Sequence, residues 1–403
     1  MFIEIIIALL VGVLFGTITG LIPGVHVNLI SIILLSLTGY LLGFTSPLIL
    51  AVFIISMAIT HTFLDPIPSI FLGAPDADTA LAVLPGHKLL LEGKGYEAVK
   101  LTVIGSLLCL ILTIILIPLL IPVAPTIYNF IKPYMGWILV AVVTFMILKE
   151  KTLKKKFWAF TVFSISGILG LIVLNLNSLE QPLFPLLSGL FGISILVTSL
   201  NTKVTLPKQI ISETIHVSKK NIAKSITAGT FSGTLTGLFP GLGAAQAAII
   251  GTQLTGNIGS HAFMILVGGV NTVNFMFSLV TLYTLQKARN GAVIAVMEII
   301  KSINIKELII FIAVALIVGG IATFLALKIT KIFARIINKI NYQKLVFGII
   351  ILITTLIFIF SKPLGLLVLF ISTAAGIIPS AVGVGKNHAM GCLLLPVILF
   401  FLI

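Results

Sequence analysis

A glycine- and proline-rich motif occurs twice in the chain and is the clearest candidate for binding chemistry. "GTITGLIPG" covers residues 16–24 and "GTLTGLFPG" covers residues 233–241, with seven identities in nine positions. Proline after glycine-rich backbone cannot continue an ordinary helix, so some amide groups at each motif lack intrahelical partners. The half-helix that follows presents its positive N-terminal end there, which favours binding of an anion.

Small and polar residues in and near the two motifs are the predicted substrate ligands. Threonine hydroxyls supply hydrogen bonds, and glycines allow a close approach to the backbone. The candidates are Thr19, Gly20, Pro23, Gly24, His26 and Asn28 in the first half, and Thr236, Gly237, Pro240, Gly241 and Gly243 in the second. The alternative is helix packing through small residues, which is common in membrane bundles. Recurrence in both halves favours a shared site, although His26 fits a helix-end cap equally well.

All three aspartates of the chain fall within one segment, Thr60–Lys100. The segment is too polar and too interrupted by proline and glycine for one membrane span, yet too apolar for a free loop, so we predict a re-entrant hairpin. Asp65, Asp76 and Asp78 are candidates to bind a coupling cation. Asp76 and Asp78 would equally well cap the following helix, whereas Asp65 is favoured because it ends an apolar span.

The second half has a different set of polar residues in the corresponding place. Asn271 and Asn274 lie within an apolar span at helical spacing, where they would bind substrate or form interhelical hydrogen bonds. Lys287 and Arg289 follow and take the place of the acidic cluster, where either would attract an anion. For Arg289 a structural role at the membrane edge is favoured.

The composition identifies the kind of molecule that must position these residues. Of 403 residues, 59% are hydrophobic and 9% are charged, whereas soluble domains have about 25% charged residues. The chain is therefore expected to be a multi-pass protein of the cell membrane. Long apolar runs and the lack of an alternating pattern predict an all-α bundle of transmembrane helices.

Motifs for catalysis and for cofactors are missing from the sequence. There is no Walker phosphate loop and no HExxH metal pair, and Cys109 and Cys392 both lie in apolar segments. We therefore expect no enzyme, no catalytic residues, no metal site and no cofactor, apart from coupling to Na⁺ or H⁺. The net charge of +14 comes from short loops beside spans, which argues against nucleic-acid binding.

The lysine-rich loops predict the topology. Lys149–Lys156, Asn201–Lys224 and Lys328–Lys344 should be cytoplasmic by the positive-inside rule. We predict a first repeat at residues 1–205, a cytoplasmic linker at 206–222 and a second repeat at 223–403. Each repeat has about seven spans, counting short or re-entrant pieces broken at the Pro-Gly motifs. An odd number inverts the second repeat, so the two Pro-Gly turns should meet near the membrane midplane.

The ordered motifs resemble a known family. "GLIPGVHVN", then "FLGAPDADTALAVLPGHKLLLEGKGYEAVKLTVIGSLL", then "GLFPGLGAAQAA" look like the large membrane subunit of the tripartite tricarboxylate transporters, the TctA family. The likeness runs from about residue 8 to the C-terminus. It implies ion-coupled uptake of carboxylates such as citrate, with a small membrane subunit and an extracytoplasmic binding protein as partners. It also implies that the two Pro-Gly turns and "APDADTA" frame the substrate and cation sites.

We therefore expect a secondary, ion-coupled transporter of small organic anions, most simply di- or tricarboxylates. As a membrane protein it would also contact membrane lipid. A carrier or flippase for a lipid-linked phosphate is the alternative, because the same half-helix ends suit phosphate. A non-transporting membrane scaffold or receptor is the alternative of another class, favoured if the Pro-Gly turns enclose no polar cavity.

Overall fold

The computed structural model describes residues 2–22, 27–73, 81, 83–200, 207–239, 242–288, 290–337 and 342–403. Every regular element in these ranges is a helix, which confirms the all-α prediction. Seven stretches in the described chain are long and apolar enough to cross a membrane. They are Phe2–Leu21, Pro47–Phe71, Gly95–Leu148, Leu153–Leu174, Gly259–Leu285, Ile305–Ile337 and Val346–Val382. The prediction of a polytopic helical bundle is confirmed, whereas several pieces counted as spans from the sequence form shorter helices.

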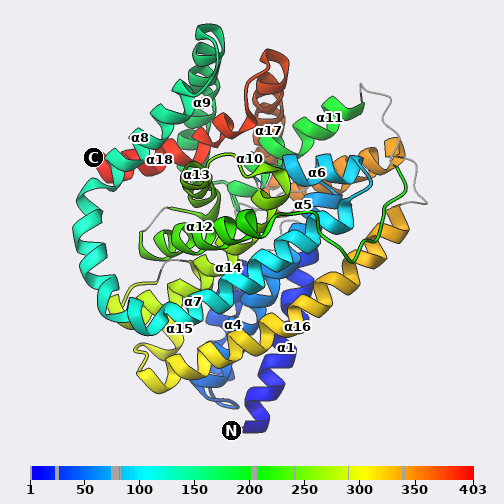
Figure 1. Cartoon of the computed structure of the whole chain (residues 1–403). Helices are drawn as coiled ribbons and strands as arrows, with labels where there is room; N and C mark the ends of the chain where they lie inside the picture. Colours follow the sequence, from blue (N-terminus) through cyan, green and yellow to red (C-terminus); the bar gives the residue numbers. More distant parts are fainter. Residues whose placement is uncertain are drawn as a thin grey trace.

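Six long helices pack together around the centre of the molecule (Figure 1). They are α1 (Phe2–Leu21), α4 (Pro47–Leu64), α7 (Gly95–Ile131), α12 (Lys219–Leu238), α14 (Gly259–Leu285) and α16 (Ile305–Ile337). The apolar windows of Pro47–Phe71 and of α14 are 89% buried, against 33% for α1 and 28% for Gly95–Leu148. α4 and α14 are therefore the inner helices, and the others separate them from the surroundings.

A second group of helices lies beside the first. It comprises α8 (Met135–Leu148), α9 (Leu153–Leu174), α10 (Leu183–Leu187), the π-helical η2 (Ser188–Ile193), α11 (Ser194–Leu200), α17 (Tyr342–Val382), η3 (Lys386–Met390) and α18 (Gly391–Leu402). α9 packs against α18, and α17 packs against η2 (Figure 1). α17 is broken at Lys362, whose φ is 57°, directly before Pro363, so it consists of two helices.

Shorter helices lie between these elements along the chain. They are α2 (Val27–Ser36), α3 (Thr38–Leu41), α5 (Pro66–Phe71), α6 (Val83–Leu91), η1 (Lys132–Tyr134), α13 (Ala244–Thr255) and α15 (Gly291–Ile300). In the predicted hairpin, α4 gives way at Asp65 to α5, and α6 begins after residues 74–80 and 82, which are outside the described residues. The second half differs, because α14 continues without a break to Leu285.

The glycines of the repeated motif allow two helix pairs to pack closely. A Cβ atom at Gly16 of α1 would lie 2.6 Å from the Cβ of Thr60 on α4. In the second half, a Cβ atom at Gly233 of α12 would lie 2.7 Å from the Cβ of Val273 on α14. Neither helix pair leaves room for a side chain, so the glycines set the distance between the helices.

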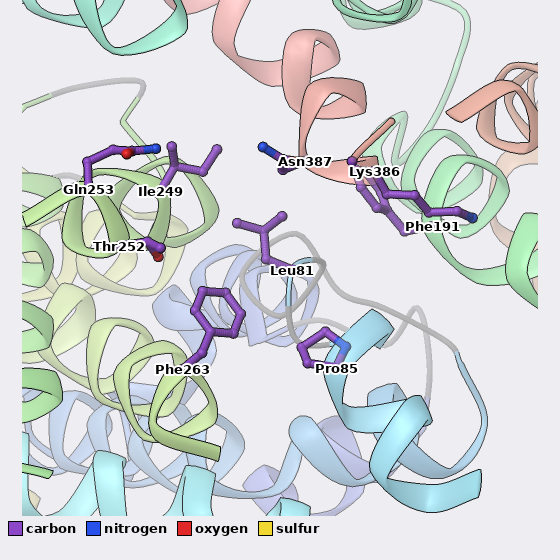
Figure 2. Close-up of a pocket in the computed structure, with 10 residues that line it drawn as sticks. Leu81, Pro85, Phe191, Ile249, Thr252, Gln253, Phe263, Lys386 and Asn387 are labelled. Atoms are coloured by element: carbon purple, nitrogen blue, oxygen red, sulfur yellow. The ribbon is translucent and has the colours of Figure 1, made fainter. Parts of the chain in front are cut away.

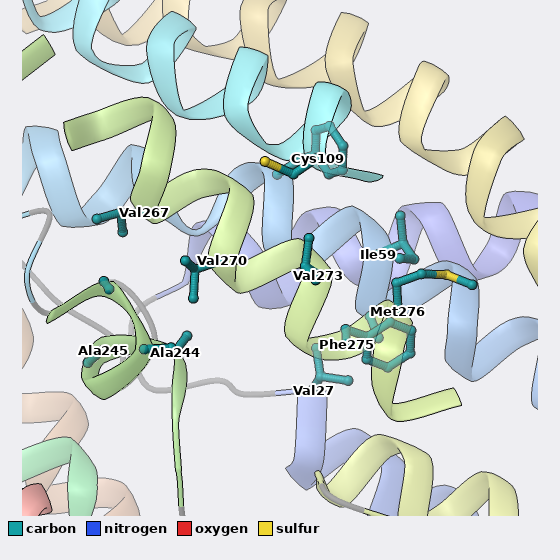
Figure 3. Close-up of a cluster of buried hydrophobic side chains, with 14 of the residues drawn as sticks. Val27, Ile59, Cys109, Ala244, Ala245, Val267, Val270, Val273, Phe275 and Met276 are labelled. Atoms are coloured by element: carbon teal, nitrogen blue, oxygen red, sulfur yellow. The ribbon is translucent and has the colours of Figure 1, made fainter. Parts of the chain in front are cut away.

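Buried hydrophobic side chains from both halves meet between the inner helices. Figure 3 shows Ile59 of α4 near Val273 and Met276 of α14, with Cys109 of α7 close by. Ser106 of α7 donates a hydrogen bond to the carbonyl of Gly268 at 3.0 Å. The two halves therefore share one core and are not two separate packing units.

The predicted linker is tied to the bundle. Residues 207–218 contain no helix, and α12 begins at Lys219. The side chain of Gln209 accepts a hydrogen bond from the backbone N–H of Gly95 at 2.9 Å and donates one to the carbonyl of Leu90 at 2.8 Å. These hydrogen bonds attach the segment to the end of α6 and the start of α7.

Candidate functional site

A row of buried polar side chains runs across the inner helices from α1 to α14. The Nδ1 atom of His61 lies 3.1 Å from the Thr19 hydroxyl, and its Nε2 atom lies 3.9 Å from Oδ2 of Asp65. The side-chain amide of Asn271 donates a hydrogen bond of 2.8 Å to the same Oδ2 atom. All four side chains are buried. This polar row, Thr19–His61–Asp65–Asn271, joins the first half of the chain to the second.

The local sequence explains why these side chains meet. His61 and Asp65 are four residues apart and so lie on one face of α4. Pro66 lacks a backbone N–H and ends α4 at this point, which places Asp65 at the junction with α5. Thr19 lies in the last turn of α1, which packs along α4 through its glycines. The close packing of the repeated motif against α4 therefore places Thr19 next to His61.

The hydrogen-bond pattern indicates where a proton can be held. When the Thr19 hydroxyl donates to the Gly16 carbonyl at 3.2 Å, its oxygen accepts from a protonated Nδ1 of His61. Nε2 of His61 then faces the carboxyl group of Asp65. A proton on either group turns this contact into an attraction, whereas its removal sets a lone pair against a carboxylate. The pair therefore suits one exchangeable proton or another small cation.

A second polar contact accompanies the row on the same two helices. The hydroxyl oxygens of Thr62 on α4 and Thr272 on α14 lie 3.2 Å apart, and both side chains are buried. Thr62 also donates to the carbonyl of Ile59 at 2.9 Å. Polar groups at such depth need partners, and each of these two hydroxyls has one on the opposite half of the chain in addition to its own helix.

The structure brings together three of the predicted site residues and leaves others apart. Thr19, Asp65 and Asn271 meet, and Gly20 packs against Leu64, whose Cβ a side chain there would approach to 2.8 Å. Asn274 is half-buried one turn beyond Asn271. The predicted residues Pro23, Gly24, His26, Asp76, Asp78, Pro240 and Gly241, together with the side chain of Asn28, lie outside the described residues.

In the second copy of the motif the equivalent residues bond locally. Thr236 is buried and donates to the Gly233 carbonyl of its own helix at 2.6 Å. Gly237 packs against Phe277, and Gly243 is the residue before the first turn of α13. Lys287 donates to the hydroxyl of Tyr128 at 3.3 Å and lies over its ring. Among the described residues this end shows packing and capping contacts.

The site also contains a residue that was not among the predicted ligands. His61 connects Thr19 to Asp65, and its signal in the sequence is the spacing His61-x-x-x-Asp65 before a proline. A histidine on an apolar helix is ambiguous by itself, because burial and capping are both common for it. The described part of the chain has no cluster of three or more His, Cys, Asp or Glu residues that would hold a metal ion.

The fold and the polar row define a class of protein. Seven long apolar helices form a polytopic integral membrane protein, and buried ionisable residues within such a bundle are typical of transport pathways. The family model described as "Tripartite tricarboxylate transporter TctA family" matches residues 6–391. The chain belongs to that family, as its motifs predicted, and is a transporter component and not an enzyme.

A relative in an archaeon covers almost the same length. The uncharacterized protein MJ1079 of Methanocaldococcus jannaschii is 30% identical over 404 residues, which are 98% of this chain and 98% of that protein. No solved structure matches the chain. The family name indicates a system of three components, so a tricarboxylate transporter of this kind has other subunits and a substrate anion.

Proposed function

We propose that the chain is the ion-coupled permease of a transporter for small organic anions, of which di- and tricarboxylates are the first candidates. The observation that carries the coupling step is the polar row Thr19–His61–Asp65–Asn271, which lies between the two halves. The family supports the carboxylate class of substrate.

The coupling cation in this proposal is a proton shared by His61 and Asp65. A buried carboxylate is costly in a membrane bundle unless a partner offsets its charge. Asn271 supplies one hydrogen bond to the carboxyl group, and in this proposal cation binding at Asp65 favours the arrangement in the structure. Release of the cation would favour a different packing of α4 against α14.

The two halves would move relative to each other in this mechanism. Asp65 belongs to the first half and Asn271 to the second, so their hydrogen bond forms or breaks when the halves shift. The Pro-Gly turns at 23–24 and 240–241 are proposed to open the anion site to one side of the membrane at a time, as in transporters with inverted repeats. The predicted repeats, the re-entrant hairpin and the symport mode are parts of this proposal.

The test is transport by the purified protein in proteoliposomes. Radiolabelled citrate and succinate are offered with an imposed proton gradient, with a sodium gradient, and with neither. Wild type should accumulate a carboxylate only with the proton gradient. Asp65→Asn should lose accumulation while retaining exchange of labelled for unlabelled carboxylate, because neutral Asn mimics the protonated carboxyl group.

Glu180→Gln is the matched control, since Glu180 is an exposed carboxylate paired with Lys362 on the surface. This variant should transport like wild type. Each measurement is repeated with the small membrane subunit and the binding protein added, because the family is tripartite. Accumulation by Asp65→Asn equal to wild type would contradict the proposed coupling, and accumulation driven by sodium alone would replace the proton by Na⁺.

A further inference from the structure

A cavity of about 260 Å³ lies between the two groups of helices, away from the polar row. Its walls come from α13 and α14 on one side, from η2 and η3 on another, and from Leu81 and from Pro85 of α6, both within the predicted hairpin segment. One space is therefore bordered by the helix after the second Pro-Gly turn, the predicted hairpin segment and the glycine-rich stretch before α18.

Two carboxamide side chains face this space. Gln253 projects from α13 and Asn387 from η3, and Figure 2 shows them pointing toward each other across the cavity. Neither side chain forms a hydrogen bond with another described residue. Thr252 also borders the cavity, but its hydroxyl donates to the carbonyl of Ala248 at 2.7 Å. The two amides are thus the available donors.

The cavity wall includes a buried cation. Lys386 is 7% exposed, and its ammonium group donates to the hydroxyl of Ser194 at 2.9 Å. No described carboxylate forms an ion pair with it. Figure 2 shows its stem at the cavity and its nitrogen directed past Phe191, away from the two amides. Lys386 therefore contributes a positive field to the cavity and not a direct contact in this conformation.

The charge balance decides what the cavity prefers. Among its described lining residues Lys386 is the charged one, and no acidic side chain is present. A positive charge in a low-dielectric surrounding is screened poorly, so it favours anions over cations and neutral molecules. Phe191, Phe263 and Ile249 supply apolar walls that would pack against a short carbon chain. The combination fits a small carboxylate.

The geometry points to this cavity as a binding site for the carboxylate group of the transported anion, with the amides of Gln253 and Asn387 as direct ligands and Lys386 as the residue that sets the sign of the charge. The inference rests on the proposed carboxylate transport, which it deepens by naming a place for the substrate. Lys386 is a positioning residue here, because it acts through its field.

The test measures the field and the ligand without relying on transport. Thr252→Cys places a thiol on the cavity wall without removing either amide, and both native cysteines are fully buried, which keeps background labelling low. Leu254→Cys is the matched control, because Leu254 also belongs to α13, is exposed and does not line the cavity. Labelling rates are measured with a negatively charged and with a neutral methanethiosulfonate reagent.

The negatively charged reagent should be favoured at Thr252→Cys relative to Leu254→Cys by a factor on the order of ten. Citrate and succinate should protect Thr252→Cys, whereas the neutral succinamide should not. Lys386→Met should remove both the preference and the protection, and Lys386→Arg should restore them. A purely structural role of Lys386 would change the labelling by both reagents alike and would leave their ratio unaltered.

Two outcomes would overturn the inference. Equal reagent ratios at the two cysteines, with no protection by citrate or succinate, would show that the cavity does not bind carboxylates even if wild type transports them. Protection by inorganic phosphate alone would assign the cavity to another anion class. Protection by carboxylates in a protein that transports none would instead leave the site intact and contradict the proposed function.

Discussion

The helix pairs α1–α4 and α12–α14 pack alike but differ in the side chains that they bury. Gly16 packs against Met57 and Thr60, and Gly233 packs against Val270 and Val273. His61 and Asn274 each follow the contacted residue and are therefore equivalent positions. In the first pair, α4 ends one turn after His61, at Asp65, directly before Pro66. In the second pair, α14 continues without a break to Leu285. The repeated motif thus sets the packing, and the facing helix carries the chemistry.

The largest expected effect tests the shared packing. Gly16→Leu and Gly233→Leu should each destabilise the protein by about 3 kcal/mol, because both insert a side chain where the next helix leaves no room. Thermal unfolding of the purified variants in detergent measures this. Gly320→Leu on α16 is the control, since a Cβ atom there meets nothing within 4 Å. Loss of stability in only one of the two glycine variants would break the equivalence.

The next effect separates the two asparagines of α14. Asn271→Leu should abolish coupled uptake and lower stability by about 2 kcal/mol, because it leaves the buried carboxyl group of Asp65 without this donor. Asn274→Leu, one turn further and half-buried, should lower stability by less than about 1 kcal/mol and leave uptake within about twofold of wild type. Similar losses in both variants would contradict the assignment of the site to Asp65 and Asn271.

A smaller effect is expected for the equivalent threonines. Thr19→Val removes the partner of His61 and should cost about 1 kcal/mol of stability, together with a change in the pH dependence of uptake. Thr236→Val removes a hydroxyl that bonds within its own helix and should cost less than about 0.5 kcal/mol. The pH profiles of uptake by the two variants provide the comparison, and a shifted profile for Thr236→Val would place chemistry in the second copy.

The smallest effect lies at the surface. The hydrogen bond from Lys331 holds the pKa of the exposed Glu213 carboxyl group below its ordinary value, and Lys100 adds to this. Any resulting stability is present above the ordinary pKa of about 4.5 and is lost as the pH falls through the lowered value. Glu213→Gln should therefore leave thermal stability at pH 7 nearly unchanged. A large loss of thermal stability at pH 7 would instead indicate that the contacts of residues 207–218 contribute strongly to the stability of the bundle.

The sequence predicted the fold class and part of the site for identifiable reasons. Apolar length and composition fix the helical membrane class, and rare polar residues in apolar spans led to Asp65 and Asn271. Their hydrogen bond joins positions 206 residues apart, and such a pairing depends on how the helices pack, which local patterns do not encode. His61 was missing from the predicted ligands because burial and capping are both common for a histidine on an apolar helix.

The cavity was beyond sequence reasoning for a similar reason. Lys386 and Asn387 lie in a glycine-rich stretch that is typical of a loop, and Gln253 lies on a short helix without a notable pattern. Only the packing of η3 against α9 and α17, and of α13 against α12 and α14, defines where these residues lie. The buried state of Lys386 is a property of the assembled bundle and not of its neighbours in sequence.

The central claim is that Asp65 and His61 hold the coupling proton, and proton release or uptake on binding tests it most directly. Citrate is added to purified protein in a weakly buffered solution containing a pH indicator, at a series of pH values. Wild type should take up about one proton per bound citrate within some part of the pH range, and Asp65→Asn should take up none while still binding citrate. Equal proton uptake by both proteins would contradict the account.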